Sequence, residues 1–243
     1  MSGHSKWSTI KRKKGANDAQ RAKIFTKIAR EIIVAVKAGG PDPDNNSSLK
    51  DAIAKARSNN MPNDNINRTI KKAAGDTDGD NYESITYEGY GPAGVAVIVN
   101  ALTDNRNRTA ADVRHAFDKN GGNMGQTGCV SFMFDQKGII IIENEDMDED
   151  EITIDALEAG ADDIEVEDGV AEIVTATSDM GAVRDALAEK YTISSAEVSM
   201  VPQTMTELTE EGQINAMTKL LDMLEDNDDV QDVYHNWDMP SED

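Results

Sequence analysis

The chain has 243 residues, 38% of them hydrophobic and 5% aromatic, and its 24 Lys and Arg against 46 Asp and Glu set a formal net charge of −22. This length accommodates one to two domains with modest cores, and no apolar run approaches the roughly 20 residues that span a bilayer. The single cysteine, Cys129, excludes an internal disulfide framework and a multi-cysteine zinc site, so we expect a soluble cytoplasmic protein with no membrane association.

The N-terminal third is predicted to be helical behind a flexible arm. Residues 1–15 are polar and basic and cannot bury enough apolar area to fold alone. From Asp18 the apolar residues recur every three or four positions, which predicts a helix that ends at Gly39. A second helix is predicted to begin at the capping residue Ser48, and a third, short helix carries an apolar stripe over residues 66–73. Three helices with one thin stripe each predict a small bundle.

The pattern changes from helix to strand after a linker at residues 75–81. Two runs, 82–87 and 95–102, have the composition of strands. They flank the Gly-Pro-Ala-Gly turn of residues 91–94, which predicts that the two strands pair in antiparallel fashion.

A helix and a further strand are predicted next. Capping-box spacing between Thr109 and Asp112 predicts a helix that begins there and runs to about residue 120. The glycine-rich run 121–128 follows a helix and precedes a strand, whereas phosphate-binding glycine loops follow a strand and open a helix, so we interpret it as a wide turn. Residues 130–134 are predicted to form the strand, with Cys129 as a small core residue beside it.

Residues 138–201 show the order strand, helix, strand, strand, helix, strand, which is typical of a ferredoxin-like unit. A helix over about 209–224 and a strand over 230–234 are too little for a separate domain, so we expect them to complete the sheet begun at Tyr82. The predicted fold class is α+β, with an N-terminal three-helix domain followed by two α/β (ferredoxin-like) domains, the third inserted into the second. The predicted domain boundaries are 1–77, then 78–136 together with 202–243, and 137–201.

The two signs of charge are segregated along the chain. Residues 1–75 hold 16 Lys and Arg and six Asp and Glu, a net charge of +10, whereas residues 76–243 hold 8 basic and 40 acidic side chains, a net charge of −32. Beyond a Debye length of about 8 Å, electrostatic attraction depends on the local patch rather than on the whole molecule. The basic third can therefore bind a polyanion although the chain as a whole is acidic.

Seven short motifs occur along nearly the whole chain. They are GHSKW at Gly3–Trp7, KIFTKI at Lys23–Ile28, YEGYGP at Tyr87–Pro92, DNRNRT at Asp104–Thr109, GGN at Gly121–Asn123, EVSM at Glu197–Met200 and DDVQDVYHN at Asp228–Asn236. In these motifs the sequence resembles the YebC/PmpR family of probable transcriptional regulators, which also includes mitochondrial translational activators. The resemblance implies a three-domain cytoplasmic protein, with a basic helical N-terminal domain and two α/β domains, that binds DNA and regulates transcription.

Basic residues of the first 30 positions form the main candidate site, because cations that neutralise phosphates release counterions. Trp7, next to Lys6, could stack on an unpaired base. The competing interpretation is a solvated tail followed by a solvated helix face. The predicted nucleic-acid-binding residues of this part are Lys6, Trp7, Lys11, Arg12, Lys13, Lys14, Arg21, Lys23, Lys27 and Arg30.

Arg106 and Arg108 are a second candidate, since a helix start offers free amide groups and a positive dipole end to an anion. Pairing with surface carboxylates is the alternative, and both interpretations stay open. The acidic cluster of residues 222–232 lacks a calcium-loop pattern and is interpreted as a solvated helix-to-strand turn. No nucleophile motif, metal-spaced histidine pair or P-loop occurs, so we expect no enzymatic activity, catalytic residue, metal site or cofactor.

These features predict a non-enzymatic transcriptional regulatory protein that binds DNA through its basic N-terminal domain. The alternative is a ribosome-associated translation factor that binds ribosomal RNA, because both nucleic acids present the same phosphates. A pure protein adaptor is a third possibility. The expected partners are nucleic acid, as DNA or ribosomal RNA, together with the transcription machinery or the ribosome, and the chain is expected to be a monomer.

Overall fold

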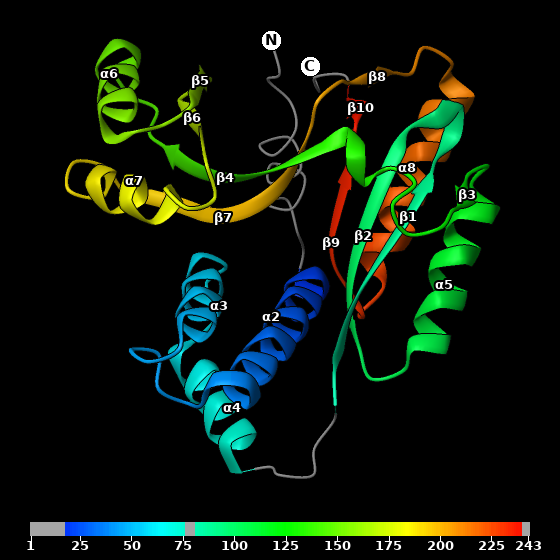
Figure 1. The fold of residues 1–243 in the computed structure, drawn as a ribbon, viewed down its shortest axis with the longest axis horizontal. Coiled ribbons are helices and arrows are strands. Elements are labelled where there is room, and N and C mark those ends of the chain that lie inside the picture. The colour runs from blue at the N-terminus through cyan, green and yellow to red at the C-terminus, as the bar shows by residue number, and fades with distance from the viewer. Residues whose placement is uncertain (1–17, 76–80, 240–243) are drawn as a thin grey trace. The chain divides into compact units, whose positions relative to one another are not determined.

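The computed structural model describes residues 18–75 and 81–239. The flexible arm predicted for residues 1–15 lies outside these ranges. Within them the chain forms two compact units, one of residues 133–205 and one of residues 18–75, 81–132 and 206–239 (Figure 1). No helix of the described ranges is long and apolar enough to cross a membrane.

The N-terminal part is a bundle of three helices, as predicted. They are α2 (Asp18–Gly39), α3 (Ser47–Ser58) and α4 (Asn63–Gly75). Their apolar stripes meet in a core that includes the fully buried Ile32, Leu49 and Ala56. The predicted capping role of Ser48 is wrong, because the Asn46 side chain accepts the Leu49 N–H at 3.1 Å and so caps α3. The Asn46 amide also donates to the Ala35 carbonyl at 2.7 Å, which ties α2 to the start of α3.

The second part is a four-stranded antiparallel sheet covered by two helices. Its strands are β1 (Glu83–Tyr90), β2 (Ala96–Thr103), β3 (Asn123–Met124) and β9 (Val230–His235), in the order β3-β1-β2-β9, and its helices are α5 (Arg106–Lys119) and α8 (Glu211–Asp226). The buried residues Val97, Phe117 and Leu220 join one sheet face to both helices. The prediction that the C-terminal strand completes the sheet begun at Tyr82 is confirmed, because β9 pairs with β2.

Residues 133–205 form the ferredoxin-like unit that the sequence predicts. Its elements are β4 (Phe134–Glu143), α6 (Glu149–Ala159), β5 (Asp163–Glu167), β6 (Val170–Thr175), α7 (Met180–Leu187) and β7 (Ile193–Pro202). The strand order β5-β6-β4-β7 is antiparallel throughout, and the core of Ile140, Ile173 and Val183 lies between this sheet and its two helices. The fold is therefore α+β, with this unit inserted between β3 and α8 (Figure 1). The exact domain boundaries stay a prediction.

Two local predictions are wrong, and one small element was not predicted. The strand expected at residues 130–134 is absent, since Ser131–Met133 is a short 3-10 helix and β4 begins only at Phe134. Cys129, expected in the core, is half-buried, and the neighbouring Val130 is buried instead. A two-stranded parallel sheet of β8 (Thr206–Glu207) and β10 (Trp237–Asp238) was not predicted.

The start of α5 differs from its prediction as well. The helix begins at Arg106, and Asn105 caps it by accepting the Arg108 N–H at 3.1 Å. Thr109 is therefore inside the first turns rather than at the cap. Its hydroxyl is fully buried and has a different set of partners, which belong to the candidate site.

Candidate nucleic-acid interface

The predicted site residues fall into three groups in the structure. Those of α2 and those of α5 are described, and the remainder lie outside the described residues. The residues of that last group are Lys6, Trp7, Lys11, Arg12, Lys13 and Lys14.

The basic residues of α2 contact the segment that joins α8 to β9. We name residues 225–229 the acidic turn. Lys23 forms an ion pair with Asp226, with 2.8 Å between Nζ and Oδ1, and the Lys27 ammonium donates to the Glu225 carbonyl at 2.7 Å. Because the helical spacing of four and three puts Lys23, Lys27 and Arg30 on one side of α2, one face meets the turn.

Arg30 makes the most buried of these contacts. Its guanidinium forms an ion pair with Asp229, at 2.7 Å from Nη1 to Oδ1, and donates to the Asp228 carbonyl at 2.7 Å. The side chains of Arg30 and Asp229 are 17% and 5% exposed, so water screens this pair poorly. The guanidinium also lies 5.4 Å from the centre of the Tyr82 ring. Arg30 thus holds the helical bundle against the acidic turn.

Arg108 binds the other oxygen of the same carboxylate. Its Nη2 lies 2.8 Å from Asp229 Oδ2 and 2.8 Å from Asp104 Oδ1, and these hydrogen bonds raise the pKa of Arg108 above its ordinary value. The buried hydroxyl of Thr109 donates to Asp229 Oδ2 at 2.7 Å. Burial opposes ionisation of Asp229, but hydrogen bonds from Arg108, Thr109 and Arg30 hold its pKa below the ordinary value. Asp229 is therefore ionised and shared by α2 and α5.

The prediction of a solvated acidic turn is wrong for Asp229, which is 4% exposed. No periodicity could have identified its role, since Asp229 and Arg30 are 199 positions apart. The only available signal was charge. The DDVQDVYHN motif is acidic, whereas the DNRNRT motif and α2 carry the basic side chains that could pair with it. No group of three or more His, Cys, Asp or Glu side chains in the described ranges is placed to hold a metal ion.

The other two predicted residues are less constrained. Arg106 is exposed in the first turn of α5, where its carbonyl accepts the Tyr87 hydroxyl at 3.5 Å. Arg21 lies exposed on the first turns of α2 and has interaction partners of its own. A role in nucleic-acid binding stays a prediction for all the α2 and α5 residues.

A second set of cations lies on α3 and α4, and the sequence analysis did not assign it to a site. All five are exposed, and none forms an ion pair with a carboxylate of the described residues. They are Lys50, Arg57, Arg68, Lys71 and Lys72. The amphipathic pattern of α4 was the signal, because it left Arg68, Lys71 and Lys72 on the solvent side of that helix.

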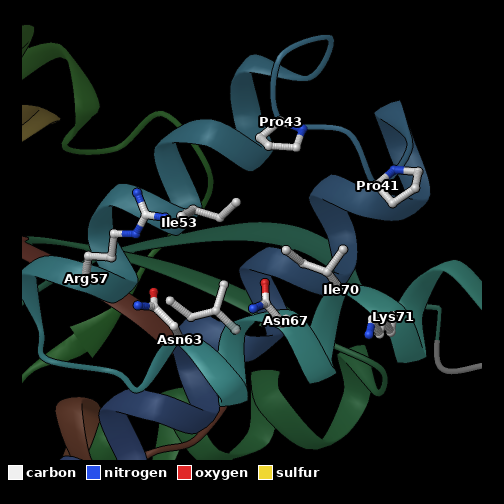
Figure 2. A pocket seen from close by; sticks show the side chains of 9 residues that line it. Pro41, Pro43, Ile53, Arg57, Asn63, Asn67, Ile70 and Lys71 are labelled. Atoms are coloured by element: carbon white, nitrogen blue, oxygen red, sulfur yellow. The ribbon is translucent and has the colours of Figure 1, made fainter.

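Two of these cations, Arg57 and Lys71, line a cavity of about 440 Å³ (Figure 2). The loop after α2 contributes Pro41 and Pro43, whereas α3 and α4 contribute the other lining residues. Those residues are Ile53, Arg57, Asn63, Ile66, Asn67, Ile70 and Lys71. The cavity thus has apolar walls with amide and cationic groups beside them.

Comparison with known proteins agrees with this architecture. The TACO1/YebC protein N-terminal domain matches residues 5–76, and the TACO1/YebC second and third domain matches residues 82–237. A "Probable transcriptional regulatory protein" of Acetivibrio thermocellus is 62% identical over 98% of this chain and 99% of its own length. A protein of the same name from Finegoldia magna is 58% identical over 98% and 99% of the two chains.

A solved structure is similar over nearly the same length. The crystal structure of a conserved hypothetical protein from Aquifex aeolicus superposes with a TM-score of 0.84 at 44% identity, over 93% of each chain. Both domain matches together span residues 5–237 with one short gap. The chain therefore belongs to the TACO1/YebC family.

Proposed function

We propose that the protein is a non-enzymatic transcriptional regulator that binds DNA through its basic N-terminal part. The observation that carries this proposal is the charge segregation, because residues 1–75 have a net charge of +10 and the rest of the chain −32. The first part has the net positive charge that attracts a polyanion, since phosphate binding requires cations that release condensed counterions. The name "Probable transcriptional regulatory protein" of the Acetivibrio thermocellus relative supports the regulatory role.

The residues proposed to contact phosphates come from three parts of the chain. They include Lys6, Lys11, Arg12, Lys13 and Lys14 near its start, with Trp7 beside them for stacking, the exposed Arg106, and the five exposed cations of α3 and α4 that form no ion pair within the described residues. Lys23, Lys27, Arg30 and Arg108 are bonded to carboxylates or carbonyls of the chain itself. These four contribute to binding only where nucleic acid displaces the acidic turn.

The salt dependence of binding tests this proposal. Fluorescence anisotropy with duplex DNA measures how the logarithm of affinity falls with the logarithm of salt concentration, by about 0.9 per phosphate neutralised. Replacing Lys11, Arg12, Lys13 and Lys14 with alanine should flatten this slope. A control with the same change of net charge replaces Lys119, Lys137, Lys190 and Lys219, all outside the basic third, and should leave the slope unchanged. An unaltered slope in the first variant would reject the proposal.

Crosslinking in cells distinguishes DNA from ribosomal RNA. Duplex DNA and structured RNA present the same phosphates, so the salt slope alone does not separate a transcriptional regulator from a ribosome-associated translation factor. Ultraviolet crosslinking followed by sequencing of the attached strands should recover promoter fragments. Enrichment of ribosomal RNA without promoter fragments would assign the protein to translation.

A further inference from the structure

The cavity among α3, α4 and the loop after α2 has the size of a small-ligand site. Its volume of about 440 Å³ falls within the range of about 300 to 1,000 Å³ that is common for small-ligand pockets. Ile53 and Ile66 are 8% and 3% exposed and belong to the bundle core, and the partly exposed Ile70 extends this apolar side at the cavity. An apolar side of this kind can pack against the flat face of an unpaired base.

The polar groups of the cavity follow one row of α4. Asn63, Asn67 and Lys71 are separated by four residues each, so they share one side of the helix. Figure 2 shows the two amides between Arg57 at one end and Lys71 at the other. An amide offers both a donor and an acceptor, which is the pattern that hydrogen-bonds the edge of a base.

None of these polar side chains has a partner elsewhere in the described ranges. Asn63 and Asn67 form no side-chain hydrogen bond there, and Arg57 and Lys71 form no ion pair. The contrast is with Asn46 in the same bundle, whose amide bonds the Ala35 and Gly40 carbonyls. The row on α4 is therefore available to a ligand that brings its own donors, acceptors and negative charge.

We propose that this cavity binds one unpaired nucleotide of a single-stranded segment of DNA or RNA. The base lies on the isoleucine wall with its edge toward Asn63 and Asn67, and the flanking phosphates lie near Arg57 and Lys71. A base inside a duplex cannot enter, because its edge is paired and its faces are stacked. The inference rests on the proposed function, since it assigns a second mode of binding to the same basic part.

An acidic peptide of a protein partner is the competing occupant. Its carboxylates could pair with Arg57 and Lys71 as well as the phosphates of a nucleic-acid strand could. It does not account for two unpaired amides placed beside an apolar wall, whereas a base uses both features. The nucleotide is therefore the occupant that the lining residues favour.

The test compares single-stranded with duplex probes on the full-length chain. The double variant Asn63→Ala with Asn67→Ala removes the base-edge contacts and no charge. Its affinity for fluorescein-labelled oligo-dA and oligo-rA should fall by about tenfold, because one good amide–base pair discriminates by roughly that much or more. Its affinity for duplex DNA should stay as in the parent chain. The ratio of the oligo-dA and oligo-rA affinities shows which strand the cavity prefers.

Controls separate this inference from the proposed function. Asn107→Ala, an exposed change on α5, should leave both affinities unchanged. A parent chain that binds duplex DNA with a steep salt slope, but whose double variant binds the oligonucleotides equally well, would reject the cavity and retain the function. The same rejection follows if duplex and single-strand affinities fall together. A parent chain that binds neither probe would overturn both.

Discussion

Asp229 shows how one buried carboxylate can connect distant parts of a chain. Each of its oxygens accepts from a different arginine, Oδ1 from Arg30 and Oδ2 from Arg108, and the hydroxyls of Thr109 and Thr103 also donate to Oδ2. Removing one partner of a buried ion pair leaves the other charges without compensation, which is costly in low-dielectric surroundings. The stability of the contact between α2 and the acidic turn therefore depends on this residue more than on the exposed pairs around it.

Asp229→Asn should lower the free energy of unfolding by about 2 kcal/mol, because it leaves Arg30 and Arg108 facing a neutral amide. Urea unfolding followed by circular dichroism measures the change. Asp226→Asn is the matched control, since it removes the same charge from the same turn at a side chain that is 70% exposed. Its cost should be below about 1 kcal/mol. An equal loss of unfolding free energy in the two variants would show that the buried ion pair stabilises the fold no more than the exposed one.

The stability effect of Asp229→Asn should depend on pH. Because the folded-state pKa of Asp229 lies below its ordinary value, the carboxylate stabilises the fold fully above the unfolded pKa of about 4, and this contribution is lost as the pH falls through the folded-state pKa. The difference in unfolding free energy between the parent chain and Asp229→Asn should therefore be constant near neutral pH and shrink below about pH 4. A difference that grows on acidification would contradict the assignment.

At the scale of elements, the sequence predicts what periodicity and local turn chemistry determine. The end of α2 at Gly39, for example, agrees with the expectation. The prediction of Thr109 as a helix cap used only its spacing to Asp112, which is local information. Its actual partner, Asp229, is 120 positions away, and no local pattern contains that contact.

A distant carboxylate also explains why no strand forms at residues 130–134. This carboxylate belongs to Glu88. Its buried carboxylate accepts the N–H groups of Gly128, Val130 and Ser131, each at 2.8 Å, and these are donors that a sheet would otherwise use. Burial alone would raise the pKa of Glu88. The backbone hydrogen bonds lower it by a larger amount, so the pKa of Glu88 lies below its ordinary value. A charged group in β1 thus fixes the shape of a loop 40 residues later.

Glu88→Gln should loosen this loop, because the amide places an N–H₂ group against backbone donors. The expected loss of unfolding free energy is about 1 to 3 kcal/mol. Cys129 reports the change directly, since it is the only cysteine of the chain. Burial and the nearby Glu88 carboxylate raise the pKa of its thiol, so iodoacetamide should label Cys129 faster in the variant.

Glu83→Gln provides the control for that experiment. It removes the same charge from the same strand at an exposed position, and it should change neither the labelling rate nor the stability by more than about 0.5 kcal/mol. Labelling of Glu88→Gln at the parent rate would show that the carboxylate does not organise the loop.

For the whole molecule, the opposite charges have two uses. Part of the +10 region binds the −32 region within the chain, through Lys23, Lys27 and Arg30. The sequence showed that the charges are segregated but not how they are divided between internal and external partners. Five cations of α3 and α4 form no ion pair with a carboxylate of the described ranges, so we expect these to contact phosphates. They are Lys50, Arg57, Arg68, Lys71 and Lys72.

Two double variants with the same loss of charge separate these uses. Lys23→Ala with Lys27→Ala should lower the free energy of unfolding by about 1 kcal/mol, because it removes an exposed ion pair and a hydrogen bond to the acidic turn. The salt slope of DNA binding should stay nearly unchanged in this double variant.

Arg68→Ala with Lys72→Ala should have the opposite effect. Both side chains are exposed, so stability should change by less than about 0.5 kcal/mol, whereas the salt slope should flatten by about 0.9 for each phosphate contact removed. Urea unfolding and fluorescence anisotropy on the same preparations measure the two quantities. If the Lys23 and Lys27 variant instead flattens the slope as much, the face of α2 exchanges the acidic turn for phosphates on binding. That exchange would place the interface on α2 rather than on α3 and α4.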